Sequence, residues 1–271
     1  MNRPLVMGIV NATPDSFSDG GRYPGVEAAL DRAEQLVGQG ADWLDVGGES
    51  TRPGAVPVSE SEEMDRVVPL ILALRSTHSI PISIDTMKPA VARAAVAAGA
   101  SMWNDVTALT RSEDSLPVCA GLGCQIALMH MQGSPASMQD SPRYDDVVAD
   151  VASYLRCRAA TALAAGIARA AIWLDPGLGF GKTTAHNLAL LARLDRIVAL
   201  GFPVLLGGSR KGVVRGVDPR AIDPADRLGG SVAIALAAAR AGVAMVRVHD
   251  VRETVQALEV AAAIAEARRG D

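Results

Sequence analysis

The chain is poor in aromatic residues and carries little net charge. Phe, Tyr and Trp make up 3% of its 271 residues, although 49% of the residues are hydrophobic. The core must therefore be built mainly from Ala, Val and Leu, as suits helices packed on a parallel sheet. The formal net charge of -4, from 26 basic and 30 acidic residues, is not the basic excess that nucleic-acid or anionic-membrane binding requires. A local basic pocket for one small anion is compatible with this balance.

Cysteines and long apolar runs are also scarce. The three Cys residues form no metal-type or CxxC pattern, and such a sparse, odd number indicates reduced thiols in a reducing compartment. The apolar run at the N-terminus is interrupted from Asn11 onward, with no small-residue cleavage site after it. No apolar stretch reaches the roughly 20 residues that span a bilayer. We therefore expect a soluble, cytoplasmic protein with no membrane partner.

Short β-rich runs alternate with longer Ala- and Leu-rich runs along the whole chain. We expect strands at 5–10, 43–46, 81–85, 102–106, 125–131, 171–175, 203–207 and 245–249, and helices at 27–38, 60–76, 89–98, 115–121, 144–165, 185–200, 225–241 and 251–268. Eight such units in this length predict one α/β domain over residues 1–271, a (β/α)8 TIM barrel. The rival is a doubly wound open sheet, but that fold usually opens its first helix with a glycine-rich turn, and here the first turn is long and polar.

Polar residues stand at the ends of most of these strands. In a barrel the strand-to-helix loops share one face, so the residues that begin them converge. The set comprises Asn11, Asp45, Asp85, Asn104, Asp105, His130, Asp175, Arg210, Lys211, Arg247 and His249. Because side chains alternate along a strand, Arg247 and His249 should point inward together, as should Ser83 and Asp85.

Each of these residues also has a purely structural interpretation. An Asp or Asn after a strand is often a helix cap or a turn former, and Asp175 precedes Pro176 and Gly177. Lys211 is explicable as a surface lysine, and a hydrogen-bonded core histidine is the favoured interpretation of His130. The functional interpretation therefore depends on the set as a whole.

As a set, these residues suit a phosphorylated heterocycle. Asp85, Asn104 and Asp175 offer the acceptors and amide groups that would hold a flat ring rich in hydrogen-bond donors. A second group, Asn11, Arg52, Arg247 and His249, would hold an anion, since Arg binds phosphate with two hydrogen bonds. Asn11 with phosphate oxygens would favour Mg²⁺ as the metal.

Two long loops and one glycine-rich block complete the pattern. Loops 11–21 and 47–55 are rich in Gly, Pro, Ser and Asp, and we interpret them as active-site lids, with Phe17 placed over an aromatic substrate. The block GLGFGKT at 177–183 is similar to a phosphate-binding loop, but its required first glycine falls on Pro176. We interpret it as a connection after the sixth strand, with Phe180 lining a pocket.

Eight sequence blocks together resemble the dihydropteroate synthase family of folate biosynthesis. They are MGIVNATPDSFSDGG (7–21), DVGGESTRPGA (45–55), SIDT (83–86), NDV (104–106), LMHMQG (128–133), LDPGLGFGK (174–182), SRK (209–211) and RVHDV (247–251). The resemblance implies a transferase that joins 6-hydroxymethyl-7,8-dihydropterin diphosphate to p-aminobenzoate, giving 7,8-dihydropteroate and pyrophosphate. It further implies a homodimer and sensitivity to sulfonamides.

The resemblance also assigns roles by position. It implies a pterin-binding set of Asp85, Asn104, Asp175 and Lys211, a diphosphate set of Thr51, Arg52, Arg247 and His249, a Mg²⁺ ligand in Asn11, and a frame for p-aminobenzoate from Phe17 and Pro53. Asp19 matches an acidic residue near the incoming amine, and Asp19, Arg52, Asp85 and Lys211 are the implied catalytic residues. The implied mechanism is dissociative, with pyrophosphate leaving first. Gly212 departs from the family, since some members carry a Ser there that touches p-aminobenzoate.

Two rival functions share the pterin-binding barrel. One is a methyltransferase that moves a methyl group from a methylated folate to a corrinoid protein, and the other is a paralogue that binds pterins without catalysis. The first has no need for Phe17 or for a diphosphate group built on Asn11, Arg247 and His249. The second should have lost pocket residues, whereas the set here is intact apart from Gly212.

Overall fold

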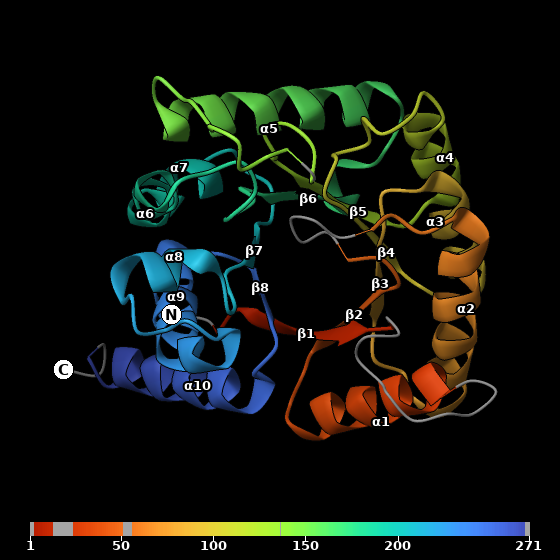
Figure 1. Ribbon diagram of the computed structural model, residues 1–271, viewed down its shortest axis with the longest axis horizontal. Helices are drawn as coiled ribbons and strands as arrows, with labels where there is room; N and C mark the ends of the chain where they lie inside the picture. Colours follow the sequence, from red (N-terminus) through yellow and green to blue (C-terminus); the bar gives the residue numbers. More distant parts are fainter. Residues whose placement is uncertain (1–2, 13–23, 51–55, 136, 269–271) are drawn as a thin grey trace.

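Eight strands alternate with helices in the computed structural model, which describes residues 3–12, 24–50, 56–135 and 137–268 (Figure 1). The strands are β1 Leu5–Asn11, β2 Trp43–Gly47, β3 Ile82–Asp85, β4 Met102–Asp105, β5 Gln125–Met129, β6 Ile172–Asp175, β7 Leu205–Gly207 and β8 Met245–Val248. The helices are α1 Pro24–Gly38, α2 Glu60–Thr77, α3 Pro89–Ala97, α4 Ser115–Leu122, α5 Val147–Ala164, α6 Thr184–Ala192, α7 Leu194–Val198, α8 Gly212–Val217, α9 Leu228–Ala241 and α10 Val251–Ala267.

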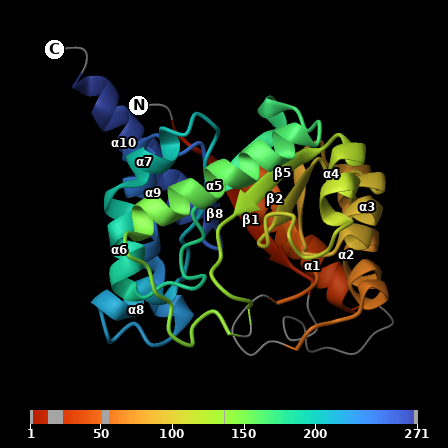
Figure 2. The ribbon, with the colours of Figure 1, turned by 90° about the horizontal axis from the view of Figure 1, so that it is seen from above.

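The strands form one parallel sheet that closes on itself. Their order is β6-β5-β4-β3-β2-β1-β8-β7, and a parallel bridge between Leu174 and Val204 joins the two end strands. The helices lie outside the strands in Figure 1, and Figure 2 gives the perpendicular view. The predicted (β/α)8 barrel is therefore confirmed, and the open-sheet alternative is wrong.

Alternation along the strands separates two apolar layers. Side chains such as Val6, Leu44 and Ile84 face outward and belong to the large core shared with the helices. The alternate positions face the barrel axis, where a second cluster fills the N-terminal half of the interior. Its members are Met7, Trp43, Met102, Ala127, Trp173, Leu205 and Met245.

The next inward layer, toward the C-terminal ends of the strands, is polar. Each polar residue of this layer follows a member of the apolar cluster by two positions. These residues are Asp45, Asn104, Asp175 and Arg247, which follow Trp43, Met102, Trp173 and Met245. The apolar layer thus forms a floor, and charged side chains stand above it.

The helices depart from the expectations in a few places. The helix expected at 185–200 is divided into α6 and α7 at Arg193, which takes φ -128° and ψ 32°. Leu190 before the break and Leu194 after it are both buried, so tertiary packing overrides the continuous helical pattern. The short helix α8 was not expected; it begins directly after Lys211. Within the described residues, no helix has the length and apolarity needed to cross a membrane.

Candidate active site

A hollow at the C-terminal ends of the strands gathers six of the predicted site residues. The strands β3, β4, β6 and β8 and the loops after β6 and β7 supply them. Its lining consists of Asp85, Asn104, Val106, Met129, Asp175, Gly177, Leu178, Phe180, Gly207, Lys211 and Arg247. The lining therefore combines carboxylates, cationic side chains and one amide with apolar side chains.

Arg247 makes ion pairs with two carboxylates at the centre of this hollow. Its Nε lies 2.5 Å from Oδ2 of Asp45, and its Nη2 lies 2.7 Å from Oδ2 of Asp85. Burial opposes the charged form of the guanidinium, but the carboxylates of Asp45 and Asp85 outweigh it, and the pKa of Arg247 is raised. The sequence predicts Arg247 as an anion ligand, which stays a prediction; in the structure two of its three nitrogens contact carboxylates from β2 and β3.

The two aspartates of the predicted pterin set are held differently. Burial, with the nearby charge of Asp45, raises the pKa of Asp85 to about 7 against the opposing effect of Arg247. Burial also raises the pKa of Asp175, whose Oδ1 accepts a hydrogen bond of 2.7 Å from the backbone N–H of Gly177. Asp175 thus both stabilises the turn after β6 and lines the hollow.

An amide and a cation complete the lining. Asn104 is 5% exposed and its Nδ2 donates to Oδ2 of Asp45 at 3.3 Å. Lys211 stands at the start of α8, with its Nζ 4.1 Å from the centroid of the Phe180 ring. This contact is a cation–π interaction, and it brings the predicted Phe180 and Lys211 together on one wall.

Two further predicted residues, Asn11 and His249, are not among the residues that line the hollow. Asn11 is exposed at the end of β1. His249 follows β8, and its Nδ1 lies 3.0 Å from Oγ of Ser209. Five predicted residues lie outside the described part of the chain: Phe17, Asp19, Thr51, Arg52 and Pro53.

Two of the polar strand-end residues have structural roles. Asp105 accepts hydrogen bonds from the backbone N–H groups of Thr107 and Leu109, each at 2.8 Å, which makes it a turn former. His130 is 6% exposed, and burial beside Lys182 lowers its pKa to about 3. The core interpretation of His130 therefore agrees with the structure.

Lys182 was missed by the sequence reasoning. It ends the block GLGFGK, yet its side chain is buried, and burial lowers its pKa to about 7. The glycine-rich block draws attention to this position, but its sequence does not indicate that the lysine is buried.

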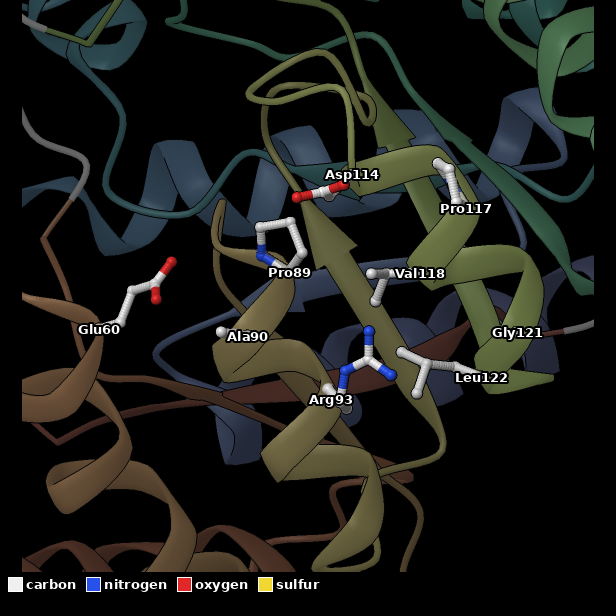
Figure 3. Close-up of a pocket in the computed structure, with 9 residues that line it drawn as sticks. All are labelled: Glu60, Pro89, Ala90, Arg93, Asp114, Pro117, Val118, Gly121 and Leu122. Carbon is white, nitrogen blue, oxygen red and sulfur yellow. The ribbon is translucent and has the colours of Figure 1, made fainter.

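A larger hollow of about 560 Å³ lies outside the barrel, between the start of α2 and the helices α3 and α4. Figure 3 shows Glu60, Arg93 and Asp114 spread around it, with Pro89 and Ala90 of α3 in the middle and Val118 and Leu122 of α4 on the side away from Glu60. None of the predicted site residues lines it. The polar hollow inside the barrel is therefore the candidate active site.

Comparison with known proteins shows which family the chain resembles. Residues 7–249 match the model of a family described as pterin binding enzyme. The dihydropteroate synthase of Escherichia coli strain K12 is 44% identical over 268 residues, which cover 99% of this chain and 94% of that protein. A structure of Xanthomonas albilineans dihydropteroate synthase with 4-aminobenzoic acid is 51% identical, with a TM-score of 0.91 over 97% of this chain and 94% of that one. A Yersinia pestis dihydropteroate synthase with a sulfonamide drug complex is 45% identical, with a TM-score of 0.91 over 97% and 95%.

Proposed function

This chain belongs to the pterin binding enzyme family, and we propose that it carries out its reaction by a dissociative route. Its activity is that of a dihydropteroate synthase, a transferase that joins 6-hydroxymethyl-7,8-dihydropterin diphosphate to p-aminobenzoate. The observation that carries the mechanism is the hollow of Asp85, Asn104, Asp175, Lys211 and Arg247, because fixed charges of both signs stabilise charge separation.

The deep part of the hollow would hold the pterin ring. Asp175 keeps one carboxylate oxygen for the Gly177 backbone, so the other is available to N–H donors of the ring. Asn104 offers both an acceptor and a donor. Lys211 and Phe180 form the wall against which the flat ring would pack.

The reaction would begin with loss of the leaving group. The bond between the pterin methylene carbon and the diphosphate oxygen breaks, and its electron pair leaves with pyrophosphate. The methylene cation that remains is stabilised by the electron-rich ring and by the carboxylates of Asp85 and Asp175. The amine of p-aminobenzoate then donates its lone pair to form the C–N bond and loses a proton, with Asp19 the proposed neighbour of that amine.

This route needs no protein nucleophile, and the buried thiols support that choice. Burial raises the pKa of Cys119 to about 12 and also raises the pKa of Cys124. Neither supplies a thiolate near neutral pH. The catalytic work would instead be positioning and charge stabilisation by Asp19, Arg52, Asp85 and Lys211.

Asn11 fits a magnesium ion shared with the diphosphate. Mg²⁺ takes few protein ligands and completes its shell with water and phosphate oxygens. Within the described ranges no three His, Cys, Asp or Glu side chains gather into a metal cage, whereas Asn11 presents an exposed amide at the end of β1. When bound, the ion supplies positive charge to the departing pyrophosphate. Thr51, Arg52, Arg247 and His249 are the proposed protein partners of the same group.

The p-aminobenzoate site would lie above the pterin, framed by Phe17 and Pro53. Sulfonamides would compete there, a proposal supported by the drug complex of the Yersinia pestis relative. Gly212 is exposed at the start of α8. A Cβ added there would meet no atom within 4 Å, so this chain leaves open the space that a serine fills in some relatives.

We also propose a cytoplasmic homodimer. Cys119, Cys124 and Cys157 are free thiols, which suits a reducing compartment. Exposed apolar side chains stand on α6 (Leu188), at the end of α8 (Val217), in the segment after α8 (Ile222) and at the start of α9 (Leu228), and exposed apolar surface commonly marks interfaces. Light scattering on the wild type and on Val217→Glu measures the mass; a monomeric wild type contradicts the dimer.

Two assays test the function and its route. Purified protein with Mg²⁺, the dihydropterin diphosphate and labelled p-aminobenzoate should yield dihydropteroate and pyrophosphate in equal amounts. No product above background, or a requirement for a corrinoid partner, refutes the activity. For the route, the bridging C–O oxygen of the diphosphate substrate is labelled with ¹⁸O, and the substrate is incubated without p-aminobenzoate. Migration of the label to non-bridging positions is expected, and full retention by an active enzyme contradicts departure before attack.

A further inference from the structure

The buried ammonium group of Lys182 sits among acceptors. Its Nζ lies 2.9 Å from the carbonyl oxygens of Gly177 and Phe180, and 3.3 Å from that of His130. The fourth neighbour is Nδ1 of His130, at 2.9 Å. Lys182 is only 3% exposed, so it has no access to a phosphate in the hollow.

The imidazole of His130 acts as an acceptor in this arrangement. Its lowered pKa keeps the ring neutral at physiological pH, and a neutral imidazole has one acceptor nitrogen. When Lys182 is protonated, its ammonium group only donates, so the accepting nitrogen is then Nδ1. The ring is held by an edge-on contact with Tyr154, at 4.9 Å between centroids.

Two of the three carbonyls that Lys182 binds, those of Gly177 and Phe180, belong to the turn that builds one wall of the active site. Within this turn, the N–H of Gly177 donates to the carboxylate of Asp175, and the ring of Phe180 packs against the ammonium of Lys211. Lys182 thus binds the backbone carbonyls of Gly177 and Phe180. The same two residues contact Asp175 and Lys211 of the pocket through the Gly177 N–H and the Phe180 ring.

The turn packs directly against the segment after β5. A Cβ on Gly177, which takes φ 67°, would lie 2.0 Å from the carbonyl oxygen of His130, and one on Gly181, at φ 62°, would lie 2.5 Å from that of Gln132. Glycine permits both the left-handed conformation and the close approach. At this contact the two segments bring the carbonyls of His130, Gly177 and Phe180 together, and the Nζ of Lys182 donates hydrogen bonds to them.

We propose that Lys182 is a positioning residue for the pterin pocket, whose ammonium group fixes the 177–180 turn and thereby sets where the Asp175 carboxylate and the Phe180 ring stand. It acts through the backbone and touches no substrate. The inference rests on the proposed function, because it concerns the pocket for the pterin ring.

The test compares substitutions that differ in hydrogen-bonding capacity. Lys182→Met removes every donor, and Lys182→Gln keeps an amide that donates two hydrogen bonds. Arg75→Met is the matched control, because the Arg75 guanidinium also binds backbone carbonyls, those of His78 and Ile80, but does so at the opposite, N-terminal end of the barrel. Calorimetric titration with 6-hydroxymethyl-7,8-dihydropterin, which lacks the diphosphate, reports on the pterin pocket alone.

The expected result separates positioning from general stability. Because Lys182→Met removes every donor that holds the 177–180 turn, it should weaken pterin binding by roughly tenfold or more. The pterin affinity of Lys182→Gln should lie between those of wild type and Lys182→Met. Arg75→Met should bind the pterin with wild-type affinity despite a lower Tm. In the double variant Lys182→Met/Phe180→Ala, the loss of pterin-binding free energy should be smaller than the sum of the two single losses, since both substitutions act on the same wall of the pocket.

Unchanged pterin binding in Lys182→Met overturns the inference, as does an equal loss in Arg75→Met. If Lys182→Met fails to fold, Lys182→Gln decides, and wild-type affinity in that variant overturns the inference. A wild-type chain that does not bind the pterin overturns the proposed function, and this inference with it.

Discussion

Replacing Lys88 by Met should destabilise the fold strongly, because Lys88 is the cation of a buried cluster beside the barrel. Its Nζ lies 2.6 Å from Oε2 of Glu63, on α2, and 3.2 Å from Oε2 of Glu49, which follows β2. The three side chains are 8%, 0% and 6% exposed, respectively. Glu49 also accepts a hydrogen bond of 3.1 Å from the N–H of Val58, so the cluster joins the segments before and after residues 51–55.

The magnitude follows from these distances. With an effective dielectric constant of about 20, charges 2.6 Å and 3.2 Å apart attract by about 6 and about 5 kcal/mol, and each ion has a desolvation cost of several kcal/mol. Removing one partner leaves the other charge buried and costs about 3–5 kcal/mol. With a urea m-value of about 3 kcal/mol/M, the midpoint should fall by roughly 1 to 1.7 M.

Urea titrations followed by circular dichroism measure this shift. In the Lys88→Met background, Glu63→Leu should recover at least half of the loss, because it removes the fully buried carboxylate and leaves only Glu49, which keeps its hydrogen bond from Val58. Arg220→Met is the control: its side chain is 90% exposed and pairs with Asp218 at the surface, so the midpoint should not change measurably. A small shift for Lys88→Met, or a double variant no more stable than the single one, would refute the reasoning.

Two further predictions concern pH and substrate affinity. The pKa of Asp85 is raised to about 7 in the folded chain, so between its ordinary value of 3.8 and about 7 the folded state holds a proton that the unfolded state has released. The stability that Asp85 contributes is therefore present below pH 3.8 and lost as the pH rises through about 7; Asp85→Asn should flatten this part of the Tm profile between pH 4 and 8, and an unchanged slope would contradict the assignment. Gly212→Ser should lower the KM for p-aminobenzoate severalfold and leave the KM for the pterin diphosphate unchanged, as measured by steady-state kinetics. Gly229→Ser is the control, because Gly229 is another helical glycine with open space around it. Equal effects of the two substitutions would speak against a contact at position 212.

Much of the fold could be predicted because it depends on local periodicity. Strand residues alternate between two faces, so the order of Val246, Arg247 and Val248 was enough to send the valines to the helices and the arginine inward, as the structure has them. The alternation of strands and helices predicted the barrel. The barrel in turn predicted that Asp85, Asn104 and Asp175 would meet, because parallel strands all end at one face.

The pairing of the charges could not be predicted in the same way. Arg247 looked like an anion-binding residue, yet it pairs with Asp45 and Asp85, which lie 202 and 162 residues away in the chain. The sequence places each of these side chains on the inward face, but closure of the barrel decides which of them come within 3 Å.

The sequence by itself determined the strands, the face on which each side chain lies and the end of the barrel where the site forms, since these depend on a period of two or 3.6 residues. Only the tertiary structure decided that Lys88 and Lys182 are buried. Nothing in their local sequence distinguishes them from surface lysines, because a lysine is buried only where the fold brings carboxylates or carbonyls around its ammonium group.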